Sequence, residues 1–193
     1  HAPYDKLKSI QRTIADNLYE YKAERNTEIN VNKYVAHAFE KGKSIITNAK
    51  IHRNKRYVFN IDLENFFDSF HFGRVAGFFE KNKDFRWKKS MGIMLAQLTC
   101  YKGVLPQGSP CSPIITNLIC NILDMRILNL ARKYRLDYTR YADDLTFSTN
   151  DKNFLDYKNE FYCKLSKEIE KAGFKINESK TRLVFKDSRQ EVT

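Results

Sequence analysis

Three aspartates have the type and placement needed for metal-dependent chemistry. Asp143 and Asp144 stand side by side within RYADDLTFS (140–148), and Asp62 closes the apolar stretch YVFNID (57–62). Carboxylates held close together repel one another and raise each other's pKa, so a divalent cation is the natural compensation. Magnesium fits because it takes hard oxygen ligands and completes its shell with water and substrate phosphates. Two such ions about 3.5–4 Å apart can activate an attacking hydroxyl and stabilise a leaving pyrophosphate.

The Asp-Asp pair has a simpler alternative interpretation, because Asp is common in polar hairpin turns. An isolated pair would favour that alternative. Here the pair has apolar, strand-like sequence on both sides, a distant aspartate ends another strand-like segment, and the whole chain is basic. Together these features favour the metal site.

The elements expected around these acids can bring them together. Apolar and β-branched residues predict strands at 57–62, 136–142, 144–149 and near 181–186, and helical periodicity predicts helices at 64–82, 87–99, around 114–128 and at about 154–172. If the helices between the first two strands are an insertion, the order is β-α-β-β-α-β, the ferredoxin-like arrangement of an α+β fold. In such a sheet the strand ending at Asp62 lies beside the hairpin that carries Asp143 and Asp144.

The first 55 or so residues are predicted to be mostly helical. Apolar residues recur at helical spacing in two groups, the second of which ends at a probable stop, Gly42: Leu7, Ile10, Ile14, Leu18 and Tyr21, then Val31, Val35 and Phe39. No repeat, low-complexity tract or Pro/Gly/Ser-rich linker divides the chain. We therefore predict a helical part over 1–56 and a sheet-containing part over 57–193, with a helical insertion at about 71–104.

Composition limits the classes of protein to which the chain can belong. Hydrophobic residues make up 42% of its 193 residues, as in a globular domain, and there is no run of about 20 apolar residues and no N-terminal apolar signal. Lys and Arg outnumber Asp and Glu by 34 to 23, which gives a formal charge of +11. This charge favours a polyanionic partner, although a solvated basic surface or an acidic membrane would also account for it. We expect a soluble, cytoplasmic protein without a membrane partner.

The cysteines do not form a metal-binding pattern. None of them shows CxxC spacing, and the histidines do not accompany them at zinc-ligand intervals: Cys100, Cys111, Cys120 and Cys163, with His1, His37, His52 and His71. We expect reduced, buried thiols in a reducing compartment.

Four short motifs, in order along the chain, resemble those of reverse transcriptases. NIDLENFF (60–67) resembles the first palm motif, LPQGSP (105–110) the nucleotide-pocket loop, YADD (141–144) the YxDD box, and GFKINESKT (173–181) the motif that follows it. Within the family, NAKIH (48–52) resembles the NAxxH element of retron reverse transcriptases. EVT at 191–193 is similar to the start of the same group's VTG element.

The resemblance implies a polymerase palm with a helical, partial fingers region, and it implies metal ligands. Asp62 and Asp143 match the principal ligands of two Mg²⁺ ions, for which Mn²⁺ is a possible substitute. Asp144 matches a third, less direct carboxylate, and the backbone carbonyl of Leu63 matches a further ligand. Lys180 matches a basic residue that protonates or positions the pyrophosphate, although it could equally be a surface lysine.

The resemblance also implies a nucleotide pocket. Gln107 matches the glutamine that lines the incoming sugar, Pro106 and Gly108 shape its loop, and Tyr141 and Ala142 complete the pocket. Phe67 stands five positions after Asp62, where the family places an aromatic steric gate. A ring pressed against C2′ leaves no room for a ribose hydroxyl and offers it no hydrogen-bond partner, so the product should be DNA. The alternative is that Phe67 packs in the core beside Phe66, one ring facing inward and the other facing the pocket.

The implied activity is RNA-directed DNA polymerisation. The implied partners are an RNA template, an RNA/DNA primer duplex, dNTPs and, for a retron-type enzyme, a structured noncoding RNA, often in antiviral defence. The fingers motif that clamps the triphosphate precedes, in retron-type enzymes, a segment like the one beginning at Ala2, and the thumb follows the palm; neither is in this sequence. The fragment alone is therefore expected to be inactive.

Two alternative functions are a non-catalytic RNA-binding module and a metal nuclease. Asn48 and His52, in the NAKIH segment, have either a helix-packing role or an RNA contact.

Overall fold

The computed structural model describes residues 4–29 and 35–186. The chain forms two compact units: His1–Asn32 with Phe66–Cys120, and Lys33–Asn65 with Asn121–Thr193. We call the first the helical unit and the second the sheet unit. The described residues from 35 to 56 therefore belong with the strands, whereas the sequence grouped them with the N-terminal helices. The reason is that helix α2 (Ile45–His52) packs on the sheet through His52.

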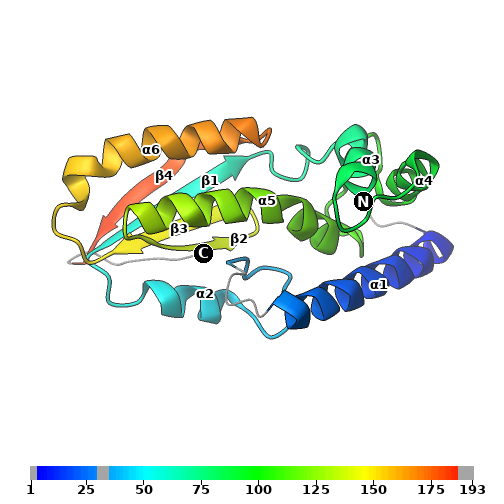
Figure 1. Cartoon of the computed structure of the whole chain (residues 1–193), viewed down its shortest axis with the longest axis horizontal. Coiled ribbons are helices and arrows are strands. Elements are labelled where there is room, and N and C mark those ends of the chain that lie inside the picture. The colour runs from blue at the N-terminus through cyan, green and yellow to red at the C-terminus, as the bar shows by residue number, and fades with distance from the viewer. Residues whose placement is uncertain (1–3, 30–34, 187–193) are drawn as a thin grey trace. The chain divides into compact units, whose positions relative to one another are not determined.

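The sheet unit contains one four-stranded sheet in the order β2-β3-β1-β4 (Figure 1). The strands are β1 (Tyr57–Glu64), β2 (Asp137–Tyr141), β3 (Asp144–Thr149) and β4 (Lys175–Phe185). β1 pairs antiparallel with both β3 and β4, and β2 and β3 form a hairpin. This is the order of a β-α-β-β-α-β fold, so the predicted ferredoxin-like sheet is confirmed.

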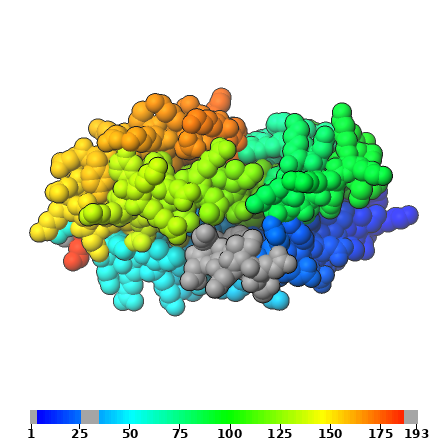
Figure 2. All heavy atoms as spheres, viewed as in Figure 1, coloured from blue at the N-terminus to red at the C-terminus, as the bar shows by residue number. Residues whose placement is uncertain are grey.

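The two faces of the sheet are covered by different helices. Alternation along β3 turns Phe147 toward α6 (Phe154–Lys171), where its ring lies 5.1 Å from that of Phe161. On the same face, Tyr138 of β2 donates to Asp124 of α5 (Ser112–Lys133). Figure 2 shows side chains of α5 and α6 covering the strands from this side. The opposite face carries polar residues and receives α2.

Helix α5 is long and apolar in composition. Among the described residues it is the one helix long and apolar enough to cross a membrane by those two criteria, and 61% of its most apolar window is buried. Its buried positions include Ile114, Ile115, Leu123 and Ile127. Burial inside the protein is what a core helix requires, so the composition of α5 is explained without a membrane.

The helical unit consists of α1 (Asp5–Ile29), α3 (Phe72–Lys81), α4 (Lys89–Thr99) and the beginning of α5. α3 and α4 approach closely at Gly92, where a Cβ atom would lie 2.8 Å from the backbone oxygen of Ala76. The Phe79 and Trp87 rings stack nearby, with centroids 4.9 Å apart. Gln11 joins α1 to the end of α4 by donating from Nε2 to the Leu98 carbonyl (2.7 Å).

Two predicted helices differ from the structure. The helical spacing of Val31, Val35 and Phe39 is misleading: residue 31 lies outside the described residues, and residues 35–39 are not helical. There the backbone pairs with β2, because Arg140 N donates to Val35 O (2.9 Å) and His37 N donates to Arg140 O (2.8 Å). The helix predicted from residue 64 begins only at Phe72, after a series of turns.

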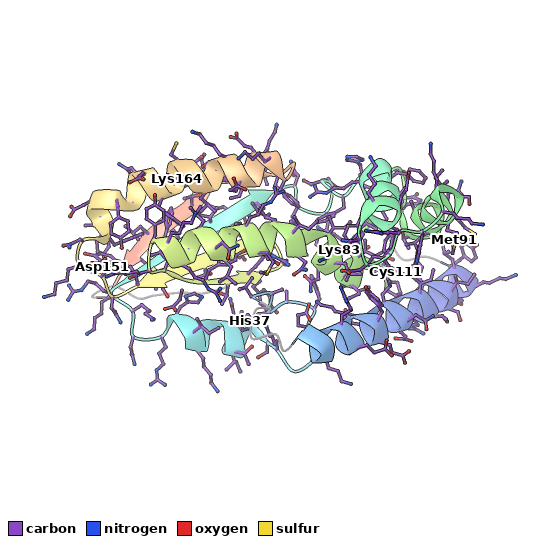
Figure 3. The ribbon with its side chains drawn as sticks, viewed as in Figure 1. His37, Lys83, Met91, Cys111, Asp151 and Lys164 are labelled. Atoms are coloured by element: carbon purple, nitrogen blue, oxygen red, sulfur yellow. The ribbon has the colours of Figure 1, made fainter. Side chains whose placement is uncertain are left out.

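The last strand and the cysteines also differ in part from the prediction. β4 begins at Lys175 rather than near 181. None of the four cysteines is disulfide-bonded. Cys111 and Cys120 are buried as predicted, but Cys100 is half-buried and Cys163 is exposed. Burial raises the pKa of the Cys100 thiol to about 11 and that of Cys111 to about 12, so both stay protonated at neutral pH. Cys111 lies at the start of α5 (Figure 3), where its Sγ donates to the Gln11 carbonyl.

Candidate active site

Strand pairing in the sheet unit places Asp62 opposite the acidic hairpin. Asp62 of β1 is the register partner of Asp144, the first residue of β3. Tyr141 and Asp144 pair across the β2–β3 connection, which leaves Ala142 and Asp143 as a two-residue turn. The end of β1 is joined to this turn directly, because Leu63 N donates to the Asp143 carbonyl (3.0 Å). The predicted meeting of the first strand with the hairpin is therefore found.

The turn has a constrained backbone. Ala142 has φ 54°, in the left-handed region that residues other than glycine seldom adopt. For an L-residue this conformation costs about 1–2 kcal/mol, so the surrounding structure must hold it. One contact that does so is a hydrogen bond from Arg140 Nη1 to the Ala142 carbonyl (3.1 Å).

Lys180 reaches the site because β4 is irregular. The pairing of β1 with β4 shifts between Asn60, opposite Arg182, and Asp62, opposite Asn177. The extra residues of β4 form a bulge, and Thr181 Oγ1 closes it by donating to the Asn177 carbonyl (3.1 Å). From this bulge Lys180 Nζ donates to Asp62 Oδ2 at 3.1 Å.

The charges at this site influence one another. Burial raises the pKa of Asp143, and the negative charge of Asp62 raises it further, while Lys180 lowers it. The bond to Asp62 raises the pKa of Lys180, with further contributions from Asp62, Asp143 and Asp144 as charges. The ammonium group thus partly compensates the repulsion among the three carboxylates.

The fit of a metal ion follows from the donors present. Asp62, Asp143 and Asp144 supply hard carboxylate oxygens, which are the ligands that magnesium prefers. Yet no group of three His, Cys, Asp or Glu side chains close enough to hold an ion exists in the part of the chain that the structure describes. Lys180 binds one of the oxygens of Asp62 instead. The donor chemistry fits divalent ions, and holding them requires the side chains to move closer; the ligand assignment stays a prediction.

Three residues near the turn were missed by sequence reasoning: Asp124, Tyr138 and Arg140. Arg140 is 1% exposed and binds Asp124 through two nitrogens, Nε to Oδ1 (2.8 Å) and Nη2 to Oδ2 (2.7 Å). Tyr138 also donates to Asp124 Oδ1 (2.9 Å). The sequence shows that Arg140 directly precedes the YADD motif, but it does not identify Asp124, in a distant helix, as the partner of Arg140.

The helical unit holds four of the predicted nucleotide-pocket residues, Phe67, Pro106, Gln107 and Gly108, whereas Tyr141 and Ala142 belong to the sheet unit. Phe66 is 3% exposed and Phe67 is half-buried, with their rings edge to face at 5.5 Å. Gln107 and Gly108 are exposed, and Gly108 has φ 87°. The loop is anchored on both sides: Ser112 Oγ donates to the Pro106 carbonyl (2.7 Å), and Ser109 Oγ donates to Gln11 Oε1 (2.9 Å). The roles of these residues remain predictions.

His52 and Asn48 are structural residues of the sheet unit. His52 is 1% exposed, and its two ring nitrogens lie 2.7 Å from Ser148 Oγ and 2.7 Å from Thr139 Oγ1. Asn48 is buried beside it on α2. Both side chains are enclosed by protein, so the helix-packing alternative is favoured over an RNA contact. The proposed EVT element at 191–193 lies outside the described residues.

These observations agree with comparisons to known proteins. The chain belongs to the reverse transcriptase (RNA-dependent DNA polymerase) family, whose model matches residues 2–192. Within that family it is similar to retron enzymes. The Ec86 retron reverse transcriptase of Escherichia coli is 34% identical over the whole chain and 56% of its own length, and the Mx162 retron enzyme of Myxococcus xanthus is 33% identical over the whole chain and 42% of its length. The predicted membership of the reverse transcriptase family and the predicted similarity to its retron-type enzymes are confirmed.

Solved structures support the fold. Apo telomerase from Candida tropicalis, truncated from its C-terminal domain, aligns with a TM-score of 0.56 at 16% identity, covering 95% of this chain and 41% of that one. Telomerase from Candida albicans, in complex with a fragment of telomeric RNA, aligns at a TM-score of 0.51 and 13% identity, covering 92% and 31%. At such identities only the palm and fingers fold is shown. The chain spans about half the length of the curated relatives it matches.

Proposed function

We propose that the protein containing this chain is an RNA-directed DNA polymerase and that the sheet unit carries its catalytic carboxylates. The observation that carries the proposal is the pairing of Asp62 with Asp144, with the Leu63 amide bonded to the carbonyl of Asp143. This arrangement aligns two strand ends so that acids far apart in sequence face a common region. Family membership supports the same reaction.

Reverse transcriptases generally use divalent metal ions. We infer that Asp62 and Asp143 hold two of them, preferably Mg²⁺, with Asp144 and the Leu63 carbonyl as further oxygen donors. When bound, such ions would lower the pKa of a primer hydroxyl and neutralise charge on a triphosphate. For Asp62 to bind an ion through the oxygen that Lys180 occupies, Lys180 must first leave it. Its exposed side chain, 64% accessible, is free to turn toward a phosphate oxygen, where it would hold or donate a proton as pyrophosphate departs.

The substrates are proposed to be dNTPs. Phe67 would exclude a ribose 2′-hydroxyl, and Gln107 would contact the sugar from the loop shaped by Pro106 and Gly108. The half-buried position of Phe67, beside the fully packed Phe66, leaves part of its ring accessible for such a role. Tyr141 and Ala142, both half-buried beside the acidic pair in the sheet unit, are proposed as further nucleotide contacts.

An RNA template paired with a primer is the proposed polymeric partner. The net charge of +11 favours a polyanion. On the resemblance of the motifs to those of retron enzymes, we propose that a structured noncoding RNA supplies the template. We propose a cytoplasmic location and an antiviral role on the resemblance alone.

The decisive experiment measures magnesium-dependent dNTP incorporation on a primed RNA template by the full-length protein and its Asp143→Asn variant. We expect extension by the parent and none by the variant, because the amide keeps the shape of the carboxylate but not its charge. Circular dichroism and thermal unfolding must show that the variant is folded. Near-normal extension by a folded Asp143→Asn protein would refute the assignment.

The alternative module, which binds RNA without catalysis, gives a different result in the same assay. It would bind primed RNA and incorporate no dNTP at any Mg²⁺ or Mn²⁺ concentration. A metal nuclease would degrade unprimed RNA or DNA without any nucleotide. That function leaves Phe67 and Gln107 without a role.

A further inference from the structure

The most unusual buried group in the sheet unit is the guanidinium of Arg140. It is 1% exposed, and Asp124, which it binds through two nitrogens, is 6% exposed at its side chain. Replacing a buried ion pair with well-packed apolar residues is often neutral or stabilising, so stability alone does not explain why a chain retains one. Its contacts indicate a second purpose.

Arg140 joins α5 to the acidic turn. Two of its nitrogens, Nε and Nη2, are engaged by Asp124, and the third, Nη1, donates to the carbonyl of Ala142 at 3.1 Å. That carbonyl belongs to the peptide that links Ala142 to Asp143. The orientation of this peptide determines the direction in which the Asp143 side chain leaves the backbone.

The backbone of Arg140 is also held in place by hydrogen bonds. Its backbone nitrogen donates to Val35 O (2.9 Å), and its carbonyl accepts from His37 N (2.8 Å), in addition to the pairing of Arg140 with Leu145 in the hairpin. With the main chain fixed on both edges and the guanidinium fixed by Asp124, the donor that faces the turn has little freedom to move.

We propose that Arg140, supported by Asp124, is a positioning residue that sets the Ala142–Asp143 peptide so that the Asp143 carboxylate is aligned for catalysis. The inference rests on the proposed function. Arg140 and Asp144 lie on opposite faces of the sheet: the Arg140 side chain is on the α5 face with Tyr138, whereas alternation along β3 places Asp144 on the face of Thr146 and Ser148. The contact through which Arg140 would act on the turn is its hydrogen bond to the Ala142 carbonyl.

The turn is thus fixed at two consecutive carbonyls. Ala142 O accepts from Arg140, and Asp143 O accepts from the Leu63 amide. Both bonds act on a turn in which Ala142 adopts the left-handed conformation. Losing the arginine bond should loosen the turn and, with it, the bond to Leu63.

The test separates positioning from stability by comparing a single and a double variant of the full-length enzyme. Arg140→Met leaves the Asp124 carboxylate buried without its cation and should lower Tm. Adding Asp124→Asn removes the second charge while keeping an oxygen that can accept from Tyr138, so Tm should recover toward the parent value. The donor to Ala142 is absent from both variants. Tyr138→Phe is the matched control, because it removes one bond to Asp124 and none to the turn.

Two properties are measured for each protein: the kinetics of dNTP incorporation and the hydrogen exchange of backbone amides. We expect kcat for dNTP incorporation to remain about 10–100-fold below the parent value in the double variant, because a displacement on the order of 1 Å at a reacting group has that effect. KM for the primed template should be unchanged. Hydrogen exchange at the Leu63 amide should be faster than in the parent, whereas exchange at the amides of Val58 and Phe59, farther from the turn in the same strand, should be unaltered. Tyr138→Phe should retain both kcat and Leu63 protection.

Recovery of both Tm and kcat in the double variant, with Leu63 protected as in the parent, would overturn the proposal. If the double variant does not fold, Arg140→Lys takes its place, since an ammonium cannot span Asp124 and Ala142 O as the guanidinium does. Its kcat and Leu63 exchange are then judged by the same standards. If the parent enzyme does not extend primers, the proposed function fails, and Leu63 exchange still decides whether Arg140 holds the turn.

Discussion

His52 should make the sheet unit sensitive to mild acid. Its imidazole is 1% exposed and lies between Ser148 Oγ and Thr139 Oγ1. Burial lowers its pKa from 6.5 to about 4, with smaller contributions from nearby charges. As the pH falls below 6.5, the unfolded chain takes up a proton at this residue while the folded chain does not, so unfolding becomes more favourable. The stabilisation is complete above pH 6.5 and is lost as the pH falls toward 4.

The size of the effect follows from proton linkage. A pKa of 6.5 in the unfolded state and about 4 in the folded state removes about 2 kcal/mol of unfolding free energy between pH 7 and pH 5, and about 3 kcal/mol by pH 4. The pKa of His37 is also lowered to about 4, chiefly by burial, so this residue adds a similar loss. Only a comparison between variants isolates His52.

Urea unfolding of the parent protein, His52→Gln and Ser148→Ala at pH 7 and pH 5 makes that comparison. His52→Gln should lose about 2 kcal/mol less than the parent between the two pH values, because it lacks the buried imidazole. Ser148→Ala keeps the imidazole buried and should retain the full acid loss, although it is less stable at both pH values. Equal losses in the parent and His52→Gln proteins would show that the imidazole is not held neutral by the fold.

Three further predictions concern other positions. Gly92→Ala should reduce the unfolding free energy by about 1–3 kcal/mol in calorimetry, because its Cβ would meet a backbone oxygen at 2.8 Å; Gly77→Ala, with open space at the same atom, should be neutral or stabilising. Phe67→Val should increase ribonucleotide incorporation relative to dNTPs in the full-length enzyme, and an unchanged ratio would remove Phe67 from the gate. Lys180→Met should lower the Mg²⁺ concentration needed for half-saturation without nucleotide, because the ammonium no longer competes for Asp62; a higher requirement would contradict this competition.

The sheet and its acids were predictable because their signals are local. Each strand is a short apolar segment, and the acidic pair lies at a turn between two of them, so the topology followed from the order of elements. The prediction placed the strand ending at Asp62 beside the hairpin, and the structure adds the register that pairs Asp62 with Asp144. Resemblance to a family added roles for these residues, which the pattern of residues alone did not contain.

The contacts that stabilise the site were not predictable because they join distant segments. Val35 and Phe39 have helical spacing, but the backbone at Val35 and His37 pairs with β2 instead. The periodicity of a sequence carries no information about such long-range pairing. The bulge that brings Lys180 to Asp62 arises from a mismatch between β1 and β4, not from any signal within β4. Likewise, the partner of Arg140 is in α5, and nothing close to Arg140 in sequence identifies it.

Two cations close to the candidate site, Lys180 and Arg140, meet different physical requirements. Lys180 is exposed, bonded to a single carboxylate oxygen and borne on a bulge, so solvent screening makes its ion pair weak and easy to exchange. Arg140 is enclosed, bound at both oxygens of Asp124 and linked to a carbonyl, so removing either partner of that pair should destabilise the unit by about 3–5 kcal/mol. Carboxylates that are to bind metal ions need a neighbouring cation that the ions can displace, and they need a backbone that holds its position. The exposed Lys180 supplies the first property, and the buried Arg140 supplies the second. Because Arg140 and not Lys180 is bonded to the turn, we expect the turn to keep its geometry when Lys180 leaves Asp62.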